Sequence, residues 1–190
     1  MEHELWLVMH DLAKHEPLWA IELLQAHLID HVDSLTRNEQ GKVALLCVRE
    51  HFAAELVKEA ASTEPLAFVQ AVVPYLRHVM ASTAVEERAD HPIYDRHFSM
   101  RFAGDDSAGS ELGDVLLEAS IRSLETLAKT VPDSIQSILG DLAADPYDAS
   151  QFLLYRCMSA EGKHFADWAA SLLLEGGRRL CSGYISDGYW

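Results

Sequence analysis

Two pairs of residues have the spacing of zinc ligands. His27 and His31 are four residues apart, and so are Cys47 and His51, which would place each pair on one face of a helix. Histidine nitrogens and cysteine sulfurs are the usual zinc ligands in proteins. If the chain turned near residue 37, His27 and Cys47 would each be ten residues from the turn, at the same height. The four residues are a candidate site for a small zinc enzyme or a metal-binding protein.

An interpretation without metal fits the same residues, and we favour it. The chain has ten histidines, so pairs at this spacing arise by chance. His31 lies beside Val32, where an imidazole at the edge of the core would fit, and Cys47 lies off the apolar stripe of its expected helix. We therefore expect no metal site and no cofactor in this chain.

The dipeptide His10-Asp11 matches one found in metal-dependent phosphohydrolases. Such a site needs a further upstream histidine and a distant aspartate, and only His3 precedes the pair. We therefore interpret His10-Asp11 as part of the polar face of a helix. The apolar residues opposite it are Leu5, Val8 and Leu12.

The sequence has no nucleotide-binding or hydrolase motif. Gly41-Lys42 is followed by Val43, where a phosphate-binding loop has Ser or Thr, and Gly162-Lys163 fails in the same way. The G-x-S-x-G elbow of the α/β-hydrolases is absent as well. The chain is therefore not expected to be an enzyme.

The composition indicates a globular domain with an acidic surface. The 190 residues include 30 acidic and 15 basic side chains, for a net charge of −15, and 49% of them are apolar. A chain of this length and apolar content can bury a core. The charge excludes a general nucleic-acid binder and disfavours an anionic membrane as partner, because both require a basic surface.

Other features predict a cytoplasmic protein. Cys47, Cys157 and Cys181 are few and far apart, which is not the pattern of a disulfide framework. The segment Met1–Glu4 is acidic, whereas a signal peptide begins with basic residues. No apolar run approaches the roughly 18 residues of a membrane span.

Helical periodicity runs through most of the chain, and no segment alternates like a strand. Two segments read as capping boxes, Thr36-Arg37-Asn38-Glu39 and Asp148 with Gln151. The predicted fold class is all-α with about eight helices. They are expected at residues 3–14, from Pro17, over about 20 residues from Thr36, from Ser62 or Thr63, from Ser110 to Pro132, from Asp133, from Asp148 and over 163–175.

A weak internal repeat favours stacked helical hairpins. Glu16-Pro17-Leu18 recurs 48 residues later as Glu64-Pro65-Leu66, and each copy follows one amphipathic helix and opens another. Near the end of the chain, His164–Trp168 aligns with Pro17–Ile21. Helix pairs in a shared register predict an α-solenoid of the HEAT or tetratricopeptide (TPR) kind. The alternative is a closed helical bundle.

One continuous domain with three segments is expected: N-terminal hairpins at 1–85, an acidic loop at 86–110 and C-terminal hairpins at 111–190. Residues 86–150 contain 14 acids and 5 bases, whereas residues 151–190 contain 4 of each. The acidic excess is therefore local. It is either a solvated face or a surface that attracts a basic protein partner.

The C-terminal part carries a further pattern of small and aromatic positions. Its residues are Pro146–Arg156, His164–Asp167, Arg178–Leu180 and Gly183–Trp190. Over residues 145–190 this pattern resembles the C-terminal helical region of large bacterial STAND-type NTPases. The resemblance implies an α-solenoid that acts as a sensor in antiviral defence. It implies no ATPase in this chain, since no Walker-type loop is present.

The leading functional prediction is a non-enzymatic helical-repeat module that recognises another protein, as a sensor or scaffold segment of a larger one. Self-association through the C-terminal edge is also expected, because an uncapped terminal hairpin exposes apolar surface. The apolar residues of that edge are Phe152, Leu153, Leu154, Phe165, Trp168, Leu172, Leu173, Tyr184, Ile185, Tyr189 and Trp190.

Overall fold

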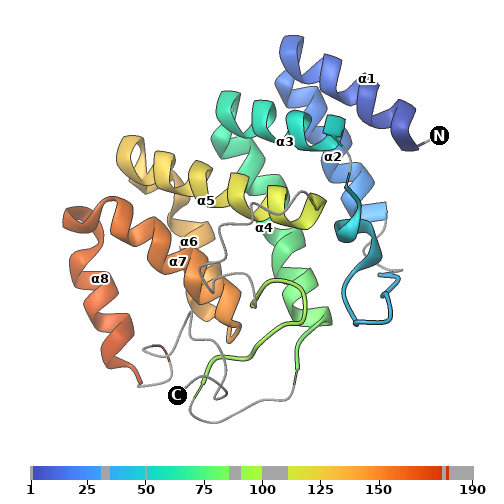
Figure 1. Cartoon of the computed structure of the whole chain (residues 1–190). Coiled ribbons are helices and arrows are strands. Elements are labelled where there is room, and N and C mark those ends of the chain that lie inside the picture. Colours follow the sequence, from blue (N-terminus) through green and yellow to red (C-terminus); the bar gives the residue numbers. More distant parts are fainter. Residues whose placement is uncertain are drawn as a thin grey trace.

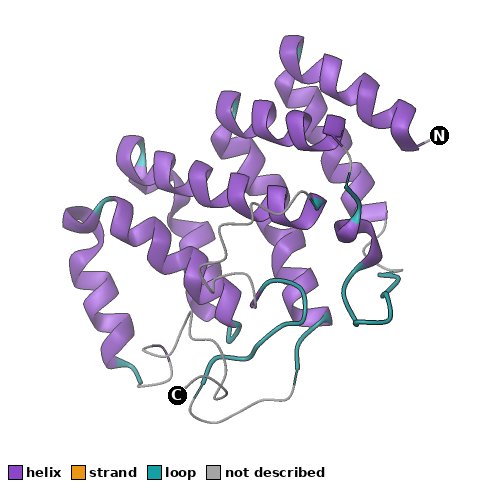
Figure 2. Ribbon diagram, in the orientation of Figure 1, coloured by secondary structure: helices purple, strands orange, loops and turns teal. Residues whose placement is uncertain are grey.

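The computed structural model describes residues 2–30, 35–49, 51–85, 91–99, 111–176 and 179. This part of the chain confirms the predicted all-α class (Figure 2), with eight α-helices and no strand beyond isolated bridges. The helices are α1 (Glu2–His15), α2 (Pro17–Asp30), α3 (His51–Thr63), α4 (Pro65–Ser82), α5 (Leu112–Thr130), α6 (Gln136–Ala144), α7 (Asp148–Ala160) and α8 (Gly162–Leu174). Two short 3-10 helices cover Ala44–Cys47 and Pro132–Ile135.

The odd-numbered helices pack in succession, α1 on α3, α3 on α5 and α5 on α7. Figure 1 shows them stepping across the molecule, with α1 and α8 at opposite ends. The even-numbered helices run down from them, and α2 packs on α4. The buried apolar side chains form one continuous core from Trp6 to Leu172. The helices are therefore arranged as a row of hairpins that share a single core.

Each hairpin turns at a single residue, which we call its corner. The corners are Glu16, Glu64, Val131 and Glu161. Three of them have closely similar backbone angles: φ −128°, ψ 64° at Glu64, φ −145°, ψ 58° at Val131 and φ −135°, ψ 66° at Glu161. In Figure 1 the links from α1 to α2, α3 to α4, α5 to α6 and α7 to α8 all lie along one edge.

The corners Glu16 and Glu64 also share a hydrogen-bond pattern. The N–H of Glu16 donates to the carbonyl four residues before it at 2.7 Å, and its own carbonyl accepts from Ala20 at 3.2 Å. Glu64 repeats both bonds, with Phe68 as the second donor at 2.9 Å. The residue four positions after each corner is buried in all four hairpins. These residues are Ala20, Phe68, Ile135 and Phe165.

This pattern confirms that Glu16-Pro17-Leu18 and Glu64-Pro65-Leu66 are equivalent, and it corrects the third alignment. The sequence comparison paired Pro17 with His164. In the structure the residue after the corner is Pro17 in one hairpin and Gly162 in the other, a shift of two positions. The sequence alignment placed Trp168 opposite an apolar residue of α2. In the structure, the distance of a residue from the corner determines whether it is buried.

The predicted third helix is wrong in its first half. Instead of a capping box at Thr36, the chain makes a turn in which Asn38 Oδ1 accepts backbone N–H groups two and four residues later, both at 3.0 Å. Gly41 has a φ of +75°, which favours glycine. A 3-10 helix follows at Ala44–Cys47, and α3 begins at His51. The Asn and Gly turn chemistry prevails over the capping pattern.

The second predicted capping box is also wrong. Asp148 is the first residue of α7, and the N-cap position, Tyr147, makes no side-chain capping bond. Gln151 instead donates through Nε2 to the carbonyl oxygens of Leu142 at 3.1 Å and Asp145 at 2.7 Å. Its amide therefore adds hydrogen bonds to carbonyls at and just after the end of α6, where a helix leaves carbonyl groups unsatisfied.

The predicted acidic loop at 86–110 is described only over residues 91–99, and there it is packed into the fold. Ile93 pairs with the α6–α7 link, since its N–H donates to Pro146 O and its carbonyl accepts from Asp148 N, both at 2.9 Å. The N–H of Arg96 donates to Thr83 O at 3.0 Å, at the end of α4. Phe98 is fully buried. The segment thus joins α4 to α7.

A buried carboxylate organises this segment. Asp95 Oδ1 accepts the N–H groups of His97 at 2.9 Å and Phe98 at 2.5 Å, and Oδ2 accepts the hydroxyl of Ser99 at 2.8 Å. Burial raises the pKa of Asp95 above its ordinary value of 3.8, and the hydrogen bonds only partly oppose this. The folded chain therefore keeps the proton of Asp95 at pH values where the unfolded chain has lost it.

This shift predicts a pH dependence of folding. The folded-state pKa is raised, so as pH rises from 3.8 through the raised pKa, Asp95 lowers the free energy of unfolding. Asp95→Asn keeps an Oδ1 acceptor but does not titrate, so its stability relative to the native chain should increase over that range. Urea unfolding at several pH values measures the difference. The control is Asp167→Asn, which changes an exposed aspartate of α8. Equal slopes for Asp95→Asn and the native chain would contradict the prediction.

Candidate protein-binding surface

The structure places the three described candidates for zinc ligands, His27, Cys47 and His51, in different environments. His27 lies half-buried on α2, with its ring edge-on to Trp6 at 5.0 Å. Cys47 ends the 3-10 helix, and its Sγ accepts a hydrogen bond from Asn38 at 3.6 Å. His51 is exposed at the start of α3, so Cys47 and His51 do not share a helix as expected. His31 lies outside the described residues.

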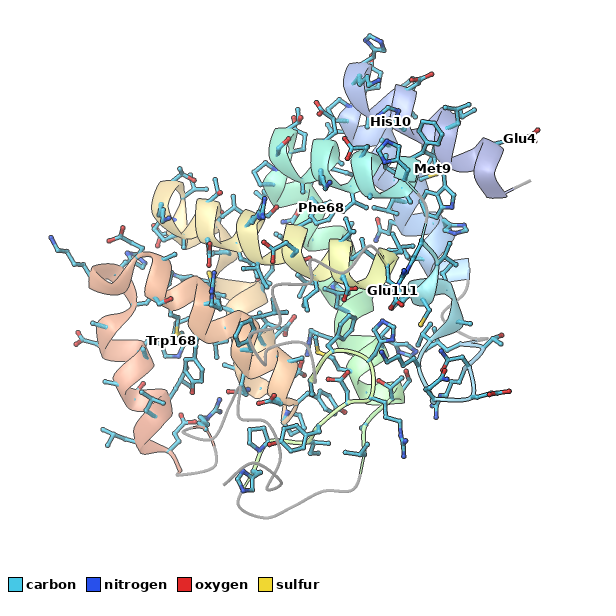
Figure 3. The ribbon with its side chains drawn as sticks, in the orientation of Figure 1. Glu4, Met9, His10, Phe68, Glu111 and Trp168 are labelled. Carbon is cyan, nitrogen blue, oxygen red and sulfur yellow. The ribbon has the colours of Figure 1, made fainter. Side chains whose placement is uncertain are left out.

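Within the described residues, no group of three or more His, Cys, Asp or Glu side chains is placed to hold a metal ion. The interpretation of His10-Asp11 as a polar face needs correction. Asp11 is exposed, but His10 is only 16% exposed and lies 5.7 Å from the Phe52 ring of α3. Figure 3 labels His10 and Met9 on α1.

The largest polar cluster lies between α4, α6 and α7. Arg77 donates from Nε to Asp145 Oδ2 at 2.7 Å and from Nη2 to Oδ1 at 2.9 Å, and Ser150 donates to the same carboxylate at 2.9 Å. Asp141 adds a second carboxylate, 3.1 Å from Arg77. The hydrogen bonds to Asp145 raise the pKa of Arg77.

The cluster extends to residue 179. Arg179 donates from Nη1 to Gln151 Oε1 at 2.7 Å and from Nη2 to the carbonyl of Ala143 at 3.0 Å. Arg77 and Arg179 are thus both paired with groups of the same fold. The cluster links α4, α6 and α7 through paired side chains. Its arrangement is that of a structural site rather than a reactive one.

A different feature stands out at the other end of the molecule. Among the described residues, eight large apolar side chains are exposed, and five of them lie on α1 or α2. We call these five the first-hairpin surface: Leu7, Val8, Leu18, Trp19 and Leu23. Val8 is 63% exposed and Trp19 is 60% exposed. Such a concentration of apolar side chains marks interaction sites on protein surfaces.

Comparison with the other hairpins shows that two of these five positions, those of Val8 and Leu23, are buried or half-buried elsewhere in the fold, whereas the equivalents of Trp19 in α8 and before α6 are exposed. Val8 lies eight residues before its corner. The equivalent residues in α3, α5 and α7 are Leu56, Ser123 and Leu153, and all three are buried. Leu23 lies seven residues after its corner, and the equivalent residue of α4, Ala71, is buried. The first hairpin therefore exposes positions that later hairpins bury.

Hydrogen bonds show what covers these positions in the later hairpins. Ser123, eight residues before its corner, donates to the carbonyl of Ala61 in α3 at 3.2 Å. Cys157, four residues before its corner, donates to the carbonyl of Leu124 in α5 at 3.4 Å. Both positions thus face the preceding odd-numbered helix. On α1 the same two positions are Val8 and Leu12.

The first hairpin also carries exposed acidic side chains. Glu4, Asp11, Glu16 and Glu22 are all exposed, and Glu4 lies at the outer end of α1 (Figure 3). The base Lys14 is 3.7 Å from Asp11. Residues 1–30 contain six acids and one base, which gives this hairpin a net charge of −5. The surface is therefore apolar with an acidic rim.

Sequence reasoning placed Val8 and Leu12 in the core and did not consider Leu18, Trp19 or Leu23. In the structure the buried face of α1 is formed by Trp6, Met9 and Ala13. A signal was present, because apolar residues occur on every side of the α2 segment. A helix that is apolar all round is buried on all sides or has an unpartnered face.

We found no family model, curated protein or solved structure that matches the chain. None of the described helices is both long and apolar enough to cross a membrane. The first-hairpin surface is therefore interpreted from its geometry alone.

Proposed function

We propose that the chain is a non-enzymatic helical-repeat module that recognises another protein. The observation that carries the proposal is the first-hairpin surface, which includes Val8, an exposed residue whose equivalents in the later hairpins are all buried, in α5 against the preceding odd-numbered helix. Desolvation of large apolar side chains, aromatic ones above all, provides most of the affinity in protein interfaces. Trp19 is the natural anchor of this one.

The arrangement of the hairpins supports an open stack in this proposal. Three of the four corners have similar backbone angles, successive odd-numbered helices pack side by side, and the first and last helices lie at opposite ends (Figure 1). In an α-solenoid each repeat contacts mainly its neighbours, so a terminal repeat keeps a face suited to another helical element. This fold departs from that rule at one place, where α4 also contacts α7. A closed bundle would leave no such face.

We further propose that the module belongs to the sensor part of a STAND-type defence protein. The support is the sequence resemblance over residues 145–190. The acidic charge of the chain supports a protein partner over a nucleic acid.

The test is a binding experiment with surface variants. Proteins that copurify with the native chain from its own cells would be identified and then reconstituted pairwise from purified components. The partner should bind the native chain, and Trp19→Ser combined with Leu23→Ser should weaken the complex at least about tenfold, as loss of an aromatic hot spot does.

The matched control is Leu174→Ser, which removes an exposed leucine from α8 at the other end of the stack. This variant should bind as the native chain does. A partner that binds the Trp19→Ser, Leu23→Ser variant with native affinity would place recognition elsewhere. The absence of any reconstituted complex would contradict the proposal as a whole.

A further inference from the structure

We infer that the first-hairpin surface takes an amphipathic α-helix of another protein, with lysine or arginine at the edge of its apolar stripe. The inference rests on the proposed function and specifies the partner's chemistry. It has three supports. They are the helices that cover the equivalent positions within this chain, a charge pair between α5 and α7, and the net charge of the first hairpin.

The first support is the shape of the covering helix. Where two successive odd-numbered helices pack, we call the earlier one the covering helix. Each covering helix has a large apolar residue seven positions before its corner and an alanine three positions before it. These pairs are Met9–Ala13, Val57–Ala61 and Leu124–Ala128, and all six side chains are buried. A helix with a large and a small apolar residue four positions apart therefore fits a surface of this kind, because the pair lies on one helix face.

The second support is a charge pair between α5 and α7. Arg156, five residues before its corner, donates to Glu125 Oε1 of the covering helix at 2.6 and 2.9 Å. The equivalent position on α1 is Asp11, which is 71% exposed and of the opposite sign. A helix that covers α1 in the same way would oppose Asp11 with the residue equivalent to Glu125. A basic residue there makes the complementary pair.

The third support argues against a second copy of the chain. Residues 1–30 have a net charge of −5, so two copies meeting through this surface would bring two acidic rims together. Like charges across an interface disfavour association. A basic helix has the opposite effect, and its binding should weaken as salt screens the rim.

The probe is a fluorescently labelled peptide with the sequence of residues 112–130, held helical by a lactam bridge on its outer face. One form has the native Glu125, a second carries Glu125→Lys, and a third has the composition of the second in scrambled order. Anisotropy titration with the full chain measures their affinities. The Glu125→Lys peptide should bind severalfold more tightly than the native peptide, and the scrambled one should bind at least about tenfold more weakly than the Glu125→Lys form.

Variants of the chain locate the site. Val8→Ser should abolish the preference for the ordered peptide, because the residue at this position of α5 faces the preceding odd-numbered helix, and Leu174→Ser should leave the preference unchanged. Asp11→Lys should reverse the preference, so that the native peptide binds more tightly than the Glu125→Lys peptide. A charge reversal of this kind distinguishes a specific contact from general attraction to an acidic protein, which would also bind the scrambled peptide.

Three outcomes would overturn the inference. The peptides could fail to bind, the scrambled peptide could bind equally well, or sedimentation could show self-association that the Trp19→Ser, Leu23→Ser variant lacks, which would make a second copy the occupant. The proposed function is judged separately by the reconstituted partner. If that partner uses the first-hairpin surface through a contact that is not a basic helix, the function stands and this inference fails.

Discussion

Asp145→Ala should lower the free energy of unfolding by about 3 kcal/mol, because it removes one member of a largely buried ion pair. Asp145 is only 12% exposed, and its carboxylate accepts three hydrogen bonds, two from Arg77 and one from Ser150. The variant leaves the Arg77 guanidinium partly buried with only Asp141 beside it. Urea unfolding followed by circular dichroism measures the loss.

Asp141→Ala is the matched control, because Asp141 contacts the same arginine from an exposed position. Its side chain is 65% exposed, and an ion pair of that kind contributes about 0–1 kcal/mol. The two variants change the net charge equally, so a difference between them reports the geometry of the cluster. Equal losses would mean that the two carboxylates stabilise the fold only through their charge, and that the hydrogen-bond geometry of the cluster contributes nothing.

Gly113→Ala should also destabilise the fold, by about 1–3 kcal/mol, because it forces an extra carbon into a filled space. A Cβ at Gly113 would lie 2.5 Å from His97 Nε2 and 3.2 Å from Leu46 Cβ. The His97 ring is buried to 1% exposure and cannot move into solvent. The loss exceeds the gain in helix propensity that alanine normally brings.

Gly140→Ala provides the control within α6. Nothing lies within 4 Å of its added Cβ, so the substitution should stabilise the chain by about 0.5–1 kcal/mol through helix propensity alone. Thermal unfolding of both variants should therefore give shifts of opposite sign. Combining Gly113→Ala with His97→Ala should cost less than the sum of the two single losses. An additive result would show that the contact with His97 is not the cause.

Much of the helix order could be predicted from the sequence, because prolines and glycines mark the corners. Pro17 and Pro65 each begin a helix, where a missing N–H costs little. The last helix was expected at 163–175 and is found at Gly162–Leu174. These signals act locally, within a few residues of the chain. They can therefore be interpreted without knowing which elements pack together.

The failures arose where tertiary packing or turn chemistry decides between two local options. The segment after Thr36 contains both a capping pattern and the turn signals Asn38 and Gly41. The structure forms the turn, and Leu46 in the 3-10 helix that follows is buried. Val8 fits an apolar stripe in the sequence but lies at the end of the stack. Its exposure depends on whether a neighbour is present, which periodicity does not reveal.

Tyr189 and Trp190 lie outside the described residues, so self-association through the C-terminal edge stays a prediction. Most apolar residues of α7 and α8 assigned to that edge are buried or half-buried, and Leu174 is the exposed one among the described leucines there. Among the described residues, most of the exposed large apolar side chains lie on the first hairpin.

The single-residue corners have a consequence for how such a chain can change length in evolution. Inserting one residue within a helix rotates everything beyond it by about 100° and would move a buried position such as Phe68 out of the core. Adding or deleting a whole hairpin leaves every corner and every buried face unchanged. Gene duplication that copies complete hairpins is therefore the tolerated route.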